Sequence, residues 1–101
     1  MFVATCEVDL LLGDVHSLKE KRSLVRPIVS ELRRRFDVAV SETGYQDLHR
    51  RAEITVAAVS GDLGRASTVV DACEEWIAQR PEVMVVGVRR RAFGGDDEGV
   101  G

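Results

Sequence analysis

The chain has 101 residues, of which 45% are apolar and 31% charged, with a formal net charge of −3. This length suits a single domain with its own core, and the composition excludes fibrous, collagen-like and membrane-spanning classes. No uncharged apolar stretch approaches the roughly 20 residues that span a bilayer, and the first residues lack the basic leader of a signal peptide. We therefore expect a cytoplasmic protein with no membrane partner.

The first predicted element is a strand over residues 2–12, in which apolar side chains alternate on one face. Ser17 and Glu20 then form a capping box, which predicts that a helix begins at residue 18. The helix is predicted to end at residue 35, and its apolar stripe consists of Leu18, Val25, Ile28, Val29, Leu32 and Phe36. Pro27 removes one hydrogen bond inside this helix, but the stripe stays in phase on both sides of it, so we expect a kink at Pro27 rather than two helices.

The remaining predicted elements are strands at 37–42 and 52–60, a helix that begins after Asp62 and ends before Pro81, and a strand at 82–91. The resulting β-α-β-β-α-β order predicts a ferredoxin-like α+β sandwich: a four-stranded antiparallel sheet in the order 4-1-3-2 with both helices on one face. We expect residues 1–93 to form this single domain. Residues 94–101, which are rich in glycine and acidic side chains, are predicted to be a disordered tail.

Residues that carry chemistry are sparse. No glycine-rich nucleotide-binding motif occurs, and neither His16 nor His49 has a partner at metal-ligand spacing. Cys6 and Cys73 lie in apolar-patterned segments, which indicates buried thiols. We therefore expect no catalytic residue, metal or cofactor, and a protein that is not an enzyme.

Positive charge is concentrated on one flank of the helix at 18–35. A helical wheel brings four basic residues into a stripe beside the apolar face, while Glu20 and Glu31 lie on the far side. The stripe consists of Lys19, Arg22, Arg26 and Arg33. A stripe of one sign suits a polyanion backbone such as RNA, although basic side chains that cover an apolar rim give the same pattern on a solvated helix. Lys21 lies on the buried side of the wheel, where its stem can cover apolar surface while its ammonium reaches water.

The ferredoxin-like topology brings the turn between the second and third strands to the start of this helix. We therefore add Tyr45, Arg50 and Arg51 to the candidate RNA-binding residues. The uncovered face of the sheet is expected to lack aromatic side chains and to carry the carboxylates of Glu7, Asp9 and Glu53, which repel RNA. Its apolar spots leave a second interpretation open, a homo-oligomeric interaction module such as a homodimer that pairs through this face. These spots are Val3, Ala57, Val59 and Val85.

The segments "SLKEKRS" at 17–23 and "SETGYQDLHRRAEITVAAVS" at 41–60 resemble the YlxP-like family, also called domain of unknown function 503, over about residues 1–93. The resemblance implies a ferredoxin-like fold. It also implies a role near translation initiation and ribosome assembly, because genes of the family lie among those for these processes. His49, where members often carry Trp, and Pro27 depart from the pattern. The positions that match are Ser17, Lys19, Glu20, Lys21, Arg22, Tyr45, Gln46, Asp47 and Arg51. Together with the basic stripe, this predicts a non-enzymatic accessory protein that binds RNA or a ribosomal particle.

Overall fold

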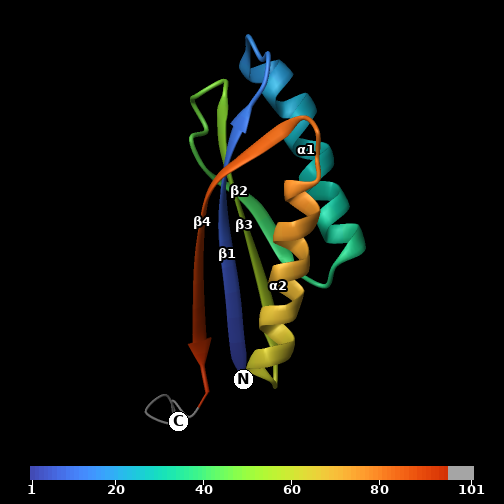
Figure 1. Cartoon of the computed structure of the whole chain (residues 1–101), viewed down its shortest axis with the longest axis vertical. Helices are drawn as coiled ribbons and strands as arrows, with labels where there is room; N and C mark the ends of the chain where they lie inside the picture. Colours follow the sequence, from blue (N-terminus) through green and yellow to red (C-terminus); the bar gives the residue numbers. More distant parts are fainter. Residues whose placement is uncertain (96–101) are drawn as a thin grey trace.

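The computed structural model describes residues 1–95, which fold in the predicted β-α-β-β-α-β order. The elements are β1 (Phe2–Leu12), α1 (Leu18–Arg35), β2 (Ala39–Gly44), β3 (Arg51–Ser60), α2 (Leu63–Ala78) and β4 (Val83–Gly94). The strands form one antiparallel sheet in the order β2-β3-β1-β4, and both helices cover the same face of it (Figure 1). The prediction of a ferredoxin-like α+β sandwich is confirmed.

The element boundaries follow local signals closely at the helices and less closely at the strands. α1 begins where the capping box predicts, because the Ser17 side chain accepts a hydrogen bond from the Glu20 amide at 3.1 Å, and it runs as one helix through Pro27. β4 continues to Gly94, and the amide of Gly95 donates to the carbonyl of Met1. Residues 96–101 lie outside the described part of the chain, so the division into a domain and a disordered tail stays a prediction.

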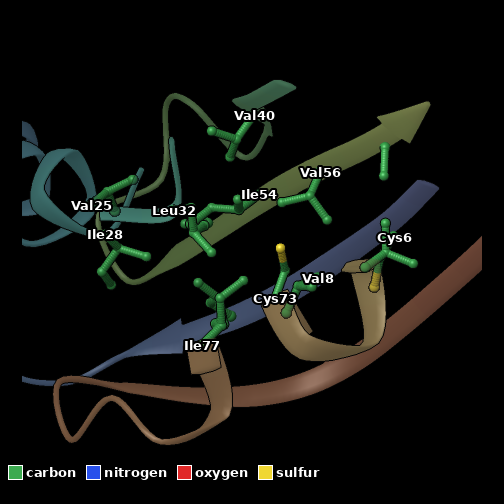
Figure 2. Packing of buried hydrophobic residues seen from close by; sticks show 14 of the residues in the cluster. Cys6, Val8, Val25, Ile28, Leu32, Val40, Ile54, Val56, Cys73 and Ile77 are labelled. Atoms are coloured by element: carbon green, nitrogen blue, oxygen red, sulfur yellow. The ribbon is translucent and has the colours of Figure 1, made fainter. Parts of the chain in front are cut away.

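The core lies between the sheet and the two helices (Figure 2). Alternate residues of β1 and β3 point into it, and each helix contributes one apolar stripe. Cys6 and Cys73 are both buried there as free thiols. Burial, followed by the charge of Cys6, raises the pKa of Cys73 to about 11, and burial is also the main cause that raises the pKa of Cys6. Neither helix among residues 1–95 is long and apolar enough to cross a membrane.

The uncovered face of the sheet differs from expectation in two respects. The β1–β4 register shifts between Asp9 and Leu10, and Val85 pairs with Leu10 and packs against the core. The prediction that Val85 lies on the uncovered face is therefore wrong. Phe93 pairs with Val3 on that face and is 52% exposed, so the expectation of a face without aromatic side chains is wrong as well.

Candidate nucleic-acid interface

Three of the predicted basic residues surround a single hollow on α1. Lys19, Arg22 and Arg26 are exposed, and with Ser23 and Pro27 they line a depression of about 390 Å³ that has no acidic lining residue. None of the three basic side chains forms an ion pair with another residue of the described chain. The hollow is thus an uncompensated positive surface.

Arg33, the fourth residue of the predicted stripe, is held differently. Its guanidinium Nη2 donates to the backbone carbonyl of Val40 on β2 at 2.8 Å. It lines a neighbouring depression of about 360 Å³ between α1 and β2, which it shares with Arg26 and with the carboxylate of Glu42. Arg33 therefore continues the stripe in position, but part of its hydrogen-bonding capacity is already used.

The positive charge of Arg34 and Arg35 at the end of α1 is largely balanced by ion pairs with Glu31. Arg34 donates two hydrogen bonds to Glu31, at 3.0 and 2.8 Å, and Arg35 donates a third at 2.9 Å. The two bonds from Arg34, and then the one from Arg35, lower the pKa of Glu31 to about 2. Arg35 also lies over the ring of Trp76. The uncompensated positive charge of α1 is consequently concentrated in its first half.

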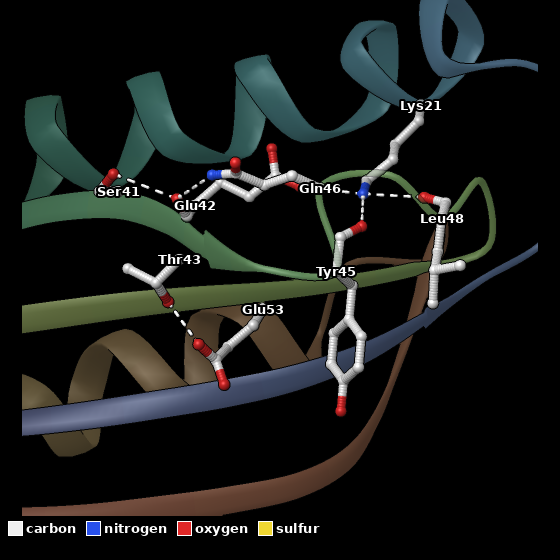
Figure 3. Close-up of polar contacts among 8 residues, drawn as sticks. All are labelled: Lys21, Ser41, Glu42, Thr43, Tyr45, Gln46, Leu48 and Glu53. Carbon is white, nitrogen blue, oxygen red and sulfur yellow. Dashed lines mark hydrogen bonds and ion pairs between the residues drawn. The ribbon is translucent and has the colours of Figure 1, made fainter.

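Lys21 lies beneath the loop that follows β2, and its ammonium does not reach water. The residue is only 2% exposed. Its Nζ donates to the carbonyls of Tyr45 at 2.6 Å and Leu48 at 2.9 Å and lies 3.0 Å from a carboxylate oxygen of Glu42, as Figure 3 shows. The prediction that this ammonium extends to solvent is wrong, because loop carbonyls some 24 positions away in sequence provide acceptors inside the protein. Lys21 fixes the loop against α1.

The same loop directs Tyr45 and Arg51 to the uncovered face of the sheet. Tyr45 has a positive φ of 57°, and its ring lies 4.5 Å from the Arg51 guanidinium. Arg51 donates to both carboxylate oxygens of Asp9 at 2.8 Å, and the Tyr45 hydroxyl donates to Asp9 at 3.4 Å. Hydrogen bonding to Asp9 raises the pKa of Arg51 above its ordinary value. The guanidinium is thus committed to a contact within the protein.

The seven predicted RNA-binding residues therefore do not form one surface. Lys19, Arg22 and Arg26 are together, and Arg33 is beside them. The loop lies against the start of α1 as expected, but Tyr45 and Arg51 point to the other side of the sheet. Arg50 donates from Nε to the carbonyl of Gly13 at 3.0 Å, where it helps to hold the loop that precedes α1.

The sequence interpretation missed a further depression, of about 230 Å³, on the uncovered face of the sheet. Carboxylates dominate its lining, which consists of Glu7, Asp9, Tyr45, Glu53, Gly87, Val88 and Arg89. The alternation of β1 and β3 predicts its acidic residues, but the participation of Tyr45 depends on a backbone conformation with no clear sequence signal. Among residues 1–95, no group of three or more His, Cys, Asp or Glu side chains is placed to hold a metal ion.

The fold defines a ferredoxin-like α+β domain with a basic helix surface and an acidic sheet surface. The chain belongs to the family described as "Protein of unknown function (DUF503)", whose model matches residues 3–90. It is 31% identical over 81 residues to the "Uncharacterized protein YlxP" of Bacillus subtilis (strain 168), and the match covers 80% of this chain and 88% of that protein. The resemblance to the YlxP-like family is confirmed.

Proposed function

We propose that this protein is an RNA- or ribosome-associated accessory protein that catalyses no reaction and binds a phosphate backbone through the first half of α1. The observation that carries the proposal is the cluster of Lys19, Arg22 and Arg26 around one hollow whose lining has no acidic residue, with no ion pair to any of the three among the described residues. The resemblance to the YlxP-like family favours a ribosomal particle as the partner that presents the RNA. A cytoplasmic location belongs to the same proposal.

The geometry suits a short stretch of single-stranded backbone. Lys19 and Arg26 are seven residues apart in sequence, which corresponds to about 10 Å along the helix axis. Because these side chains have no ion-pair partner to give up, phosphate contacts release condensed counterions without breaking a bond inside the protein. Three such contacts on a single strand predict a slope of roughly −2 for log affinity against log salt. Arg33 and Arg50 lie at the margins, and Tyr45 and Arg51 take no direct part in the contact proposed.

The test is a double charge reversal, Arg22→Glu with Arg26→Glu. Both side chains are exposed, so the fold is expected to persist and can be checked by circular dichroism. Binding is measured by fluorescence anisotropy with a labelled single-stranded RNA over a range of salt concentrations, and by co-sedimentation with purified ribosomal subunits. We expect the variant to lose both kinds of association, because attraction at two of three contacts becomes repulsion.

Arg65 provides a matched control, since it is exposed on α2 and forms no ion pair within the described residues. Arg65→Glu changes the net charge by the same amount as Arg22→Glu alone. We expect Arg65→Glu to retain association while Arg22→Glu weakens it several-fold. If the two single variants weaken RNA binding equally, net charge rather than the hollow is responsible; unchanged co-sedimentation of the double variant refutes the proposal.

A second candidate function, pairing of two copies through the uncovered sheet face, is favoured by the apolar end of that face. Val59 is 71% exposed and lies opposite Val3, which in turn lies opposite the exposed Phe93. Contiguous apolar surface of this kind is typical of protein contacts. Light scattering over a wide concentration range tests it: a homodimer that Val59→Glu dissociates supports this function, and a monomer at every concentration eliminates it.

A further inference from the structure

The two outer edges of the sheet are not equivalent. β2, at one edge, has only six residues, and side chains already donate to two of its backbone carbonyls. Arg33 donates to Val40 at 2.8 Å and Gln46 donates to Glu42 at 3.2 Å. Val40 and Glu42 are two positions apart, so their carbonyls point to the same side of the strand. In Figure 3, Gln46 reaches Glu42 on the side of β2 away from β3, which indicates that these side chains cap the outer edge.

β4, at the opposite edge, has no such cap. It is 12 residues long, and its segment Gly87–Gly94 pairs with β1 without a register shift. Figure 1 shows β4 as the outermost strand, with β1 on its inner side. In the part of the chain that the structure describes, no side chain forms a hydrogen bond with the backbone of β4. Its outer row of N–H and C=O groups is a template for another strand.

The side chains along this edge indicate which strand suits it. Arg89 and Arg91 flank the edge on the uncovered face, where Phe93 follows them, and Val88 is 40% exposed on the other face. Arg89 is 3.6 Å from Glu7, and Arg91 has no ion pair with any residue of the described chain. The edge thus combines an unpaired backbone with exposed apolar side chains and, at Arg91, a positive charge that has no ion-pair partner in the described chain.

We propose that the outer edge of β4, over Gly87–Gly94, binds an extended acidic segment of another protein by strand addition. Carboxylates opposite Arg89 and Arg91 form favourable cross-strand pairs, and apolar side chains alternate with them to cover Val88. A second copy of β4 suits this edge less well, because it brings its own Arg89 and Arg91 against those already present. A nucleic-acid backbone does not match this edge either, because a phosphodiester chain has no row of N–H donors for the outward carbonyls of β4.

The probe is an eight-residue peptide in which Glu and Val alternate, titrated into the isotope-labelled full chain and followed by amide NMR shifts and hydrogen exchange. We expect shifts and new protection concentrated in Gly87–Gly94. The same peptide with Lys in place of Glu is expected not to bind. A version N-methylated on alternate backbone amides is expected to lose binding although its charge is unchanged, since strand addition requires those amides.

Arg91→Glu should weaken binding of the Glu peptide about tenfold, because one cross-strand attraction becomes a repulsion; Arg65→Glu on α2 is the matched control and should leave it unchanged. Four results overturn the proposal: undiminished binding of the methylated peptide, equal binding of the Lys peptide, shifts that map to α1, or concentration-dependent protection of β4 without peptide. The last assigns the edge to a second copy. None of these readouts depends on whether Lys19, Arg22 and Arg26 bind RNA.

Discussion

Replacing Lys21 by Met is expected to destabilise the fold more than any surface substitution on α1. Methionine retains an apolar stem of similar length and removes only the ammonium. That ammonium donates to the carbonyls of Tyr45 and Leu48 and lies beside the carboxylate of Glu42, and the residue is 2% exposed. The substitution therefore deletes charged hydrogen bonds from a buried position without opening a large cavity.

The magnitude follows from these contacts. A hydrogen bond to a charged group contributes about 1.5–3 kcal/mol, and breaking a buried ion pair on one side costs about 3–5 kcal/mol. The Glu42 oxygen beside the ammonium, Oε2, is buried and accepts no hydrogen bond, so the substitution leaves it unpaired; the rest of the side chain keeps 26% exposure, which holds the cost at the lower end of the second range. We therefore expect Lys21→Met to lower the free energy of unfolding by about 3 kcal/mol. In a domain of this size, such a loss lowers Tm by about 12–24 °C.

Urea unfolding followed by far-ultraviolet circular dichroism measures this effect, with Lys19→Met as the control. Lys19 is exposed and is expected to change stability by less than about 0.5 kcal/mol. Hydrogen exchange at residues 45–50 should accelerate in the Lys21 variant, because the loop loses its attachment to α1. A loss below about 1 kcal/mol would refute the assignment of Lys21 as the residue that holds this loop.

Three further outcomes are expected. The free energy of unfolding should fall as the pH rises from 9 to 11, because a cysteine thiol ionises above pH 9.0 in the unfolded chain, whereas the Cys73 thiol stays protonated to about pH 11 in the folded protein. Urea titrations of Cys73→Ala should show a smaller fall over the same pH range. Gly94→Ala should lower the free energy of unfolding by about 2 kcal/mol in the same assay, because Gly94 has a φ of +109° and an added Cβ would meet the Met1 carbonyl oxygen. Gly13→Ala is the control and should leave stability nearly unchanged, because a Cβ at Gly13 meets no atom within 4 Å. Pro27→Ala should raise the unfolding free energy by about 1–2 kcal/mol, because it restores the helical bond to Ser23; an unchanged urea midpoint would contradict this.

The fold was predictable because its signals are local and mutually consistent. The Ser17–Glu20 cap sets the start of α1, and its apolar stripe sets its length. Alternation in β1 and β3 determines which of their residues enter the core. The phase of β4 was not predictable in the same way, because a register shift opposite Asp9 and Leu10 changes which of its side chains face outward.

The candidate site was predictable only where a single element determines it. Lys19, Arg22 and Arg26 share a surface because helical periodicity places them there. The position of the Lys21 ammonium depends on carbonyls of the loop at 45–48, and the direction of Tyr45 depends on its positive φ. Both are consequences of tertiary packing, which acts between segments far apart in the sequence and leaves no local pattern.

The capped edge of β2 has a consequence for assembly. Polymers built by strand pairing need two receptive edges on each molecule, one to accept a neighbour and one to offer to the next. With side chains already bonded to the Val40 and Glu42 carbonyls of β2, β4 is the one sheet edge within residues 1–95 whose backbone has no side-chain hydrogen bond. If β4 adds a strand as proposed, a sheet that grows across molecules is expected to stop after that one partner, so closed pairs are favoured over fibres.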